Sequence, residues 1–382
     1  MNRKQFLVII AVLAVLVVAA AAVLLSDRSG WKMTETRAGQ KVIPGLKISE
    51  VAEIAIRNAS GELHLVKGTG GWSVRERADF PADTDRIGEL LIKLAELKIV
   101  QDEILPENQR ARLQLVEPKD QATQDSGTLL ELKDAKGASL DRLLLGKKVL
   151  RNTEVASPAR GEDAAAGRYL VAGKDAGRML AVSEPFTQVE PRADAWLVKD
   201  LIRIDQVKSL AATGRDGKPR WTVTRDSESA DWKFAGSKEK PDLQKATDLA
   251  SSVSWMNLVD VVADPANAGT GLDRAVVIRV QTFDGPAYTL RIGNEAGGNY
   301  YVGVAAAGEP QKRRVPAKNE KAEDKAKNDK EFEERRKKLV EKLEREKKLE
   351  RWTYRVAKAG IEPLLRDRAQ LLPEKKKDAK KG

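Results

Sequence analysis

The stretch Asp83-Thr-Asp-Arg-Ile-Gly-Glu-Leu-Leu-Ile-Lys-Leu-Ala-Glu-Leu-Lys-Ile-Val100 recurs without a gap as Asp242-Leu-Gln-Lys-Ala-Thr-Asp-Leu-Ala-Ser-Ser-Val-Ser-Trp-Met-Asn-Leu-Val259. In both copies apolar residues follow the i, i+3, i+4, i+7 spacing that predicts one buried face of a helix. The aligned apolar positions are Ile87, Leu90, Leu91, Leu94 and Leu97 opposite Ala246, Leu249, Ala250, Val253 and Met256. Asp83 and Asp242 precede the stripe as predicted helix caps, where a carboxylate accepts free amides of the first turn and contributes about 1 kcal/mol. A helix that recurs at a fixed distance predicts two copies of one folding unit.

The segments around this helix repeat as well. A predicted pair of strands ends at Trp72 in the first copy and at Trp232 in the second. Downstream, Leu143-Leu-Leu-Gly146 matches Leu290-Arg-Ile-Gly293. Each copy therefore predicts an α+β unit, a mostly antiparallel sheet with one amphipathic helix packed on its apolar face. The residues expected to pack the two repeats are Trp72, Trp232, Leu90, Leu94, Leu97, Leu249, Val253 and Met256.

An unbroken apolar run extends from Phe6 to Leu25. About 20 residues, rising about 1.5 Å each, span a hydrocarbon core of about 30 Å, so we expect a single-pass transmembrane helix in contact with membrane lipid. Arg3 and Lys4 precede the run, and the positive-inside rule then puts the N-terminus in the cytoplasm and the body in the periplasm or extracytoplasmic space. A cleaved signal peptide is the alternative, because small residues occur at 19–22, but apolar residues continue past them.

The formal net charge of +11 is concentrated near the C-terminus. Residues 311–382 contain 26 Lys and Arg against 15 Asp and Glu, which leaves 42 of each sign in the rest of the chain. A nucleic-acid-binding protein more often carries its basic surface on the folded body. The distribution therefore argues against a nucleic-acid partner.

A charged segment at 308–351 interrupts the second copy, and its composition predicts a helix. Phe332, Leu339 and Leu343 approximate a seven-residue rhythm, which is typical of a projecting interaction arm or coiled-coil half. The alternative, a solvated single helix held by i, i+4 Glu–Lys pairs, is favoured because few clean heptads are present. The basic tail is expected to be disordered, as a solubilising terminus or as a contact for anionic lipid headgroups.

The predicted organisation has one membrane segment and two repeats. The segments are 1–5, cytoplasmic N-terminus; 6–25, transmembrane helix; 26–42, linker; 43–200, first α+β repeat; 201–307, second α+β repeat; 308–351, long charged helical insertion; 352–372, completion of the second repeat; and 373–382, basic tail.

The residue types that carry most enzyme chemistry are scarce. The chain has no Cys, which excludes disulfides, thiolate nucleophiles and cysteine metal sites, and it has one His. His64 lies between two leucines in a predicted strand, whose alternation turns it away from the apolar face. Asp79, Asp83 and Asp85 could bind Ca²⁺, but the second copy keeps only Asp242, which favours capping. We therefore predict no catalytic, cofactor-binding or metal-binding residues and no cofactor.

Several short motifs carry a family resemblance. They are Ile43-Pro-Gly-Leu46, Val51-Ala-Glu-Ile54, Gly71-Trp-Ser-Val74, Phe80-Pro-Ala-Asp83, Leu97-Lys-Ile-Val100 and Leu113-Gln-Leu-Val-Glu-Pro118. With them the chain resembles a bacterial membrane-anchored family catalogued as domain of unknown function (DUF4340), in which Gly is usual at the position of Gln114. The resemblance implies one membrane span with extracytoplasmic repeats and an accessory role beside ABC-type transport or gliding-motility components. It brings no catalytic residues.

We therefore expect a non-enzymatic accessory or scaffold protein of the bacterial cytoplasmic membrane, whose partner is an envelope protein such as a subunit of an ABC transporter. The alternative is a periplasmic binding module for a cell-wall glycan or small ligand in a groove between the repeats. An enzyme is the third hypothesis, and the oligomeric state stays open.

Overall fold

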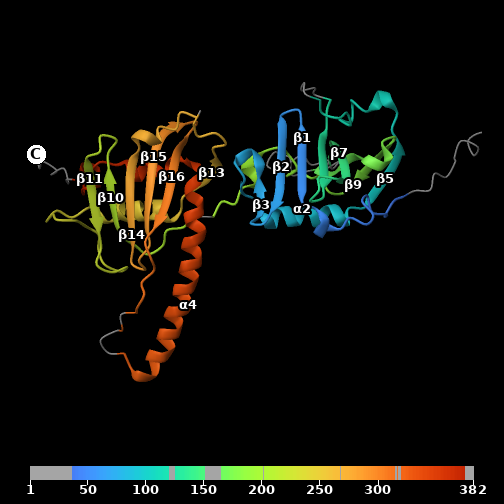
Figure 1. Cartoon of the computed structure of the whole chain (residues 1–382). Helices are drawn as coiled ribbons and strands as arrows, with labels where there is room; N and C mark the ends of the chain where they lie inside the picture. Colours follow the sequence, from blue (N-terminus) through green and yellow to red (C-terminus); the bar gives the residue numbers. More distant parts are fainter. Residues whose placement is uncertain are drawn as a thin grey trace, which may run out of the picture. The chain divides into compact units, whose positions relative to one another are not determined.

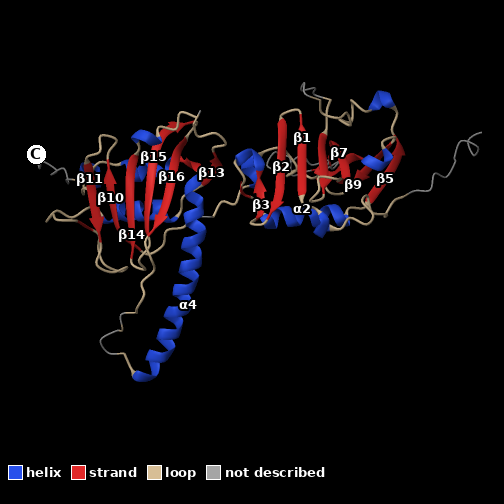
Figure 2. Ribbon diagram, viewed as in Figure 1, coloured by secondary structure: helices blue, strands red, loops and turns tan. Residues whose placement is uncertain are grey.

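The computed structural model describes residues 37–119, 125–150, 165–200, 202–266, 268–314, 316 and 320–374. These residues form mixed helix and sheet, as Figures 1 and 2 show, and the predicted α+β class is confirmed. The predicted transmembrane helix at 6–25 and nearly all of the basic tail lie outside the described residues. Among the residues described, no helix combines the length and the apolar character needed to cross a membrane.

The described strands form two sheets, of nine and eight strands. The first sheet has the spatial order β4 (Phe80–Pro81), β3 (Gly71–Val74), β2 (Gly61–Gly68), β1 (Glu53–Asn58), β6 (Thr128–Lys133), β7 (Ser139–Leu150), β8 (Ala165–Ala172), β9 (Arg178–Val182) and β5 (Ile99–Ile104). The second has the order β12 (Lys233–Phe234), β11 (Pro219–Thr224), β10 (Val207–Thr213), β14 (Val276–Thr282), β15 (Ala287–Ala296), β16 (Asn299–Ala307), β17 (Thr353–Ala357) and β13 (Leu258–Val261).

Apart from β4, the two sheets have the same topology. In each copy the strand after the helix, β5 or β13, lies at the far edge beside the last strand, β9 or β17, and pairs with it antiparallel. Both pairings contain an irregularity at the same place, between Ile99 and Gln101 and between Leu258 and Asp260. The predicted pair of sheet-rich repeats is therefore confirmed, down to a shared bulge.

Four α-helices and several 3-10 helices lie in the described residues. The α-helices are α2 (Thr84–Glu96), α3 (Leu243–Ser254), α4 (Ala322–Lys347) and α5 (Lys358–Leu365). The 3-10 helices are η1 (Ile48–Glu50), η2 (Arg75–Arg77), η3 (Glu107–Gln109), η5 (Gly173–Asp175), η6 (Ala193–Trp196), η7 (Leu272–Arg274), η8 (Lys348–Arg351) and η9 (Arg368–Leu371).

The apolar stripes of α2 and α3 are buried. Leu90 and Leu94 in α2, and Leu249 and Val253 in α3, have no exposed surface. Burying each such side chain contributes about 1.5–3 kcal/mol, so these stripes anchor the two cores. Met256, just after α3, is only partly buried.

Each copy also secures the start of its helix with its own last turn. The backbone N–H of Asp83 donates to the carbonyl of Trp196, at the end of η6, over 2.8 Å. The N–H of Asp242 donates over 2.8 Å to the carbonyl of Leu371, at the end of η9. A residue from the far end of each repeat thus meets the cap of its helix.

The described residues divide into two compact units. One contains those within Met1–Leu46, Lys93–Leu129 and Asp141–Gln188, and the other those within Lys47–Ile92, Leu130–Leu140 and Val189–Gly382. In the first unit, Gly39 and Gln40 exchange backbone hydrogen bonds with Ile99 at the start of β5. Part of the segment expected as a linker at 26–42 therefore lies against the sheet.

Within the second unit, the turn between β3 and β4 contacts β13 and the start of β17. The Arg77 guanidinium forms two hydrogen bonds with the Asp260 carboxylate, of 2.7 and 3.0 Å. Trp352 donates from Nε1 to the carbonyl of Ala78 over 3.0 Å, and its ring meets that of Phe80. A bidentate ion pair and an aromatic pair therefore hold this turn in place.

Candidate functional site

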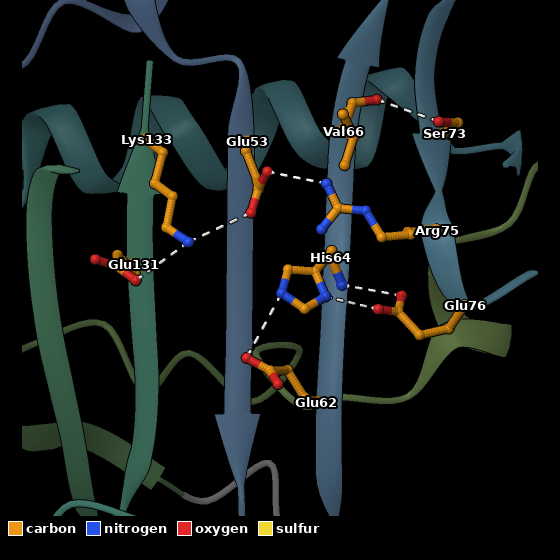
Figure 3. Close-up of polar contacts among 9 residues, drawn as sticks. All are labelled: Glu53, Glu62, His64, Val66, Ser73, Arg75, Glu76, Glu131 and Lys133. Carbon is orange, nitrogen blue, oxygen red and sulfur yellow. Dashed lines mark hydrogen bonds and ion pairs between the residues drawn. The ribbon is translucent and has the colours of Figure 1, made fainter. Parts of the chain in front are cut away.

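The outer face of the first sheet carries a network of charged side chains. Strand alternation buries Leu63 and Leu65 of β2 and turns His64 to the opposite face, as the sequence predicts. Figure 3 shows the charged side chains in front of the strands, with a helix running behind them. The polar and apolar faces are thus cleanly separated here.

Two carboxylates hold His64. Its Nδ1 lies 2.7 Å from Oε1 of Glu76, and its backbone N–H donates to Oε2 of the same residue over 2.9 Å. Its Nε2 lies 3.5 Å from Oε1 of Glu62 (Figure 3). Both ring nitrogens therefore face carboxylates of the chain itself.

Beside His64, Glu53 joins three elements. It accepts from Arg75 over 3.1 Å and from Lys133 of β6 over 3.4 Å, and Lys133 also lies 3.5 Å from Glu131 (Figure 3). Burial would raise the pKa of Glu53, but the hydrogen bond and charge of Arg75, together with Lys133, lower it below its ordinary value. Cross-strand pairs of opposite charge stabilise a sheet, which is the role this network fills.

A groove of about 500 Å³ lies over β7 and β8 in the first unit. Its apolar lining includes Leu115, Leu144 and Val171. Arg110 and Arg142 also line it, and Arg142 donates to Glu117 over 2.7 Å. The groove combines an apolar floor with basic side chains, a composition suited to an amphipathic or anionic ligand.

The second repeat has a groove of about 310 Å³ at the equivalent place. The first groove is lined by Leu144 and Val171, which are paired across β7 and β8. The second is lined by Arg291 and Gly303, which are paired across the equivalent strands, β15 and β16. The second groove also has Trp352 in its wall, and it is smaller than the first. The repeats share the position of a groove but differ in its chemistry.

A glycine sits beside each groove at a close approach of two backbones. The amide after Gly146 donates to the carbonyl of Leu113, and the amide after Gly293 donates to that of Thr270, both over 2.8 Å. A Cβ on either glycine would collide with that carbonyl. Thr270 in the second repeat is thus equivalent to Leu113 in the first. Continuing the gap-free alignment of the two helices to this point would instead place Leu272 opposite Leu113.

The charged insertion forms α4, as its composition predicts. Its last turns, and η8 directly after it, are anchored on the second sheet, because Leu343 and Glu346 of α4 and Leu349 of η8 are buried. The Tyr288 hydroxyl donates to Oε2 of Glu346 over 2.8 Å, and Lys342 lies 3.6 Å from Oε1. Burial raises the pKa of Glu346, partly opposed by the hydrogen bond from Tyr288, and burial also raises the pKa of Tyr288.

The predicted interaction residues of this helix differ in exposure. Leu343 is buried within the chain, whereas Phe332 and Leu339 are partly exposed. Leu343 is therefore used internally, and only the other two present apolar surface to solvent. Figure 1 shows the N-terminal half of α4 extending past the strands of its sheet.

A cavity of about 280 Å³ separates α4 from the turns of the second sheet. Arg335, Lys338 and Lys342 line it from the helix, and Asp205 and Asp284 line it from the sheet side. The charges of the two walls are complementary. Attraction between these exposed charges weakly favours the packing of α4 on the second sheet, and salt screens it.

The predicted caps and packing residues occupy defined places. Oδ1 of Asp83 accepts from the amide of Arg86, and Oδ1 of Asp242 accepts from that of Lys245, both over 3.0 Å. The remaining predicted packing residues are buried: Trp72, Trp232 and Leu97. No group of three or more potential metal ligands occurs among the described residues, and the side chains of Asp79, Asp83 and Asp85 form no such group.

Two contacts had no clear signal in the sequence. The carboxyl partner of Arg77 is Asp260, 183 residues away, and the partner of Phe80 is Trp352. The motif Phe80-Pro-Ala-Asp83 marked this turn only as a family feature. Gln114, at the position where the resemblance expects Gly, has φ of +54°, which explains the preference for Gly there.

Comparison with known proteins places the chain in one family. No curated protein and no solved structure matches it. A family model matches residues 72–275, more than half of the chain, and spans α2, α3 and most of the first sheet. The chain therefore belongs to the family described as domain of unknown function (DUF4340).

Proposed function

We propose that this chain is a non-enzymatic scaffold protein of the bacterial cytoplasmic membrane that binds an envelope protein through α4. The apolar run at 6–25 would serve as its membrane anchor, with the repeats in the periplasm. A subunit of an ABC transporter is the class of partner that the family resemblance implies.

The observation that carries this proposal is the way α4 is mounted. Its last turns, and η8 directly after it, are fixed by buried Leu343 and Leu349 and by the Tyr288–Glu346 hydrogen bond. Its N-terminal half extends past the strands (Figure 1). Lys330, in that half, and Lys337, just beyond the middle of the helix, are exposed. A helix anchored at one end presents a defined surface without first paying the entropy of ordering, which favours binding.

The charged face of the first sheet supports the same conclusion. His64 and Glu53 are engaged with charged neighbours of the chain itself. Such a network stabilises a fold and has no arrangement of nucleophile and base directed at a common point. A structural role for this face fits a scaffold.

Photocrosslinking in intact cells tests the proposal. A photoreactive side chain is placed at Lys330 or Lys337 of the full-length protein and, as a control, at exposed Lys208 on β10. The expected result is an adduct with one membrane-complex subunit from both α4 positions and not from Lys208. An adduct pattern that is the same at all three positions, or the absence of any adduct, contradicts it.

The membrane anchor has its own test. The full-length chain should remain in the membrane pellet after alkaline extraction, and a variant lacking residues 1–25 should be released. Added protease should digest the repeats in cells whose outer membrane has been permeabilised and not in intact cells. Release of the full-length chain by alkali contradicts the anchor without affecting the test of α4.

The groove over β7 and β8 favours a second candidate function, binding of a small ligand or glycan fragment. It differs from the expected groove between repeats in lying within one unit, beside Arg110 and Arg142. Calorimetric titration with cell-wall glycan fragments should then show binding that Arg142→Ala weakens and that Arg75→Ala, in the charged network around Glu53, leaves unchanged. Equal binding by both variants contradicts this function.

A further inference from the structure

Strand β5 ends the first sheet and exposes apolar side chains. Ile104 is 72% exposed, the highest value for any large apolar residue described, and Val100 is 59% exposed. Both lie on one six-residue strand. Exposed apolar residues are ordinary when scattered, but two on one sheet edge mark a surface that a partner covers.

The outer edge of β5 is covered only at its beginning. Gly39 and Gln40 bond to the backbone of Ile99. From Val100 to Ile104, no further backbone hydrogen bond reaches this outer edge from the described residues. The unpaired edge therefore offers its N–H and C=O groups to another strand.

This edge has a bulge at its start but lacks two other common protections against pairing. Neither Lys nor Pro occurs between Ile99 and Ile104. Its one inward carboxylate, on Asp102, is neutralised by Arg37 at 2.8 Å and by Arg178 at 2.6 Å. Lys and Pro are frequent on edge strands that avoid association, and β5 has neither; its exposed carboxylate, on Glu103, accepts a hydrogen bond from the Gln101 amide.

The equivalent strand of the second repeat, β13, has different contacts at this position. It has the same bulge, but Asp260 receives Arg77, and the carbonyl of Val259 receives the Lys199 ammonium over 2.6 Å. The chain thus covers one of its two equivalent edges by itself.

The sequence of β5 is complementary to itself. If two β5 strands run antiparallel about Asp102, Val100 of one copy lies opposite Ile104 of the other, and Gln101 lies opposite Glu103. Each pairing occurs twice, as a two-fold interface requires. Apolar pairs and amide–carboxylate pairs both stabilise cross-strand contacts. The two Asp102 carboxylates meet at the centre, and the Arg37 and Arg178 of each copy compensate them.

We propose that β5 is a dimerisation edge, which pairs antiparallel with β5 of a second copy of this chain and joins two first sheets into one. A contact between two short edges buries less than the roughly 1,200 Å² of a standard interface, so the dimer is weak and forms at high local concentration. The inference does not depend on the proposed role of α4.

Disulfide trapping tests both the partner and the register, because the chain has no cysteine of its own. Opposed residues of an antiparallel pair lie about 4.5–5.5 Å apart at Cα, within the range for a disulfide. Mixing full-length Val100→Cys with Ile104→Cys should give a crosslinked dimer at least tenfold faster than either variant alone. The matched control is a mixture of Leu243→Cys with Trp255→Cys, two exposed apolar positions elsewhere.

Sedimentation of the full-length protein gives an independent readout. Ile104→Lys should weaken self-association at least tenfold, while Leu243→Lys leaves it unchanged. Crosslinking of the mixed pair no faster than the control, or faster crosslinking by either single variant, would overturn the proposal. So would a protein that stays monomeric at about 1 mM, an outcome that would assign the edge to a different protein.

Discussion

The ring of Phe80 meets the ring of Trp352 edge to face, with 5.0 Å between centroids and 79° between planes. Phe80 has no exposed surface, and the indole of Trp352 also donates to Ala78. Residues from the two repeats therefore share one small core inside the second compact unit. This core couples the stability of the turn after β3 to that of β17.

Phe80→Ala should lower the free energy of unfolding by about 3–5 kcal/mol, because it empties a fully buried aromatic site. A double-mutant cycle with Trp352→Leu should show a coupling of about 0.5–1.5 kcal/mol from the ring contact. Guanidinium unfolding of the full-length protein, followed by circular dichroism, measures both. Leu243→Ala, at an exposed site, is the control and should change little; additivity of Phe80 and Trp352 would refute the coupling.

Gly146→Ala and Gly293→Ala should each destabilise the protein, because the added methyl collides with the carbonyl of Leu113 or Thr270. The expected cost is about 1–3 kcal/mol, typical of overpacking. Gly88→Ala in α2 has no atom within 4 Å of the new Cβ and should stabilise by up to about 1 kcal/mol through helix propensity. Thermal unfolding of the three variants checks the contrast, and the same sign for all three would rule it out.

The Tyr288–Glu346 pair should make the docking of α4 depend on pH. Burial raises the folded pKa of Glu346 above its ordinary 4.5, so protonation favours the folded state. Its contribution is fully present below pH 4.5 and is lost as pH rises through the folded pKa. Glu346→Gln should therefore stabilise the protein at pH 7 and match the parent chain in stability at about pH 4.

Tyr288→Phe is the companion variant, because it leaves the Glu346 carboxylate without its hydroxyl donor. We expect a loss of about 1–3 kcal/mol at pH 7. Tyr301→Phe on β16 is the control, and hydrogen exchange of α4 reports the local effect. Equal exchange in both variants would remove Tyr288 from the docking of α4.

Asp102 should stabilise the protein mainly above acid pH. Its burial would raise the pKa, but hydrogen bonds from Arg178 and Arg37 lower it below the ordinary 3.8. The stabilisation is therefore present above pH 3.8 and is lost as pH falls through the folded pKa. Asp102→Asn should cost about 3 kcal/mol at pH 7, and less in acid, because it removes the carboxylate of Arg178 and leaves Arg37 with Asp175 alone.

Trypsin cleavage after Arg37 gives a local measure of the same contact. In the parent chain the bonds to Asp102 and Asp175 hold Arg37, and cleavage should be slow. In Asp102→Asn it should accelerate several-fold, while Glu103→Gln has no effect. If Asp102→Asn did not accelerate cleavage, the bond between Arg37 and Asp102 would not be what slows cleavage after Arg37.

Local features of this fold follow from the sequence, and long-range ones do not. The stripes through Leu90 and Leu249 and the caps Asp83 and Asp242 are set within one or two helical turns, so spacing alone predicts them. The outward direction of His64 follows from strand alternation. Its contact with Glu76 depends on how η2 returns to the sheet, which no local pattern encodes.

The position of β5 shows why the remaining topology was out of reach. The repeated stretch 83–100 predicts a helix, whereas α2 ends at Glu96 and β5 begins at Ile99. The sequence shows neither that this strand crosses to the edge beside β9 nor that Val100 and Ile104 face solvent. The heptad-like spacing of α4 likewise predicts one apolar face but not the surface against which that face packs. Leu343 packs inside the chain, because the buried surface belongs to the second sheet.

The bonds from Asp83 to Trp196 and from Asp242 to Leu371 also order events during synthesis. The hydrogen bond at Asp83 can form once residue 196 leaves the ribosome. The hydrogen bond at Asp242 can form only after residue 371 is made, which follows the whole of α4. In nascent chains the start of α2 would therefore be bonded to its repeat's last turn before the start of α3 is. During synthesis, the second repeat would then be open to chaperones and proteases for longer than the first.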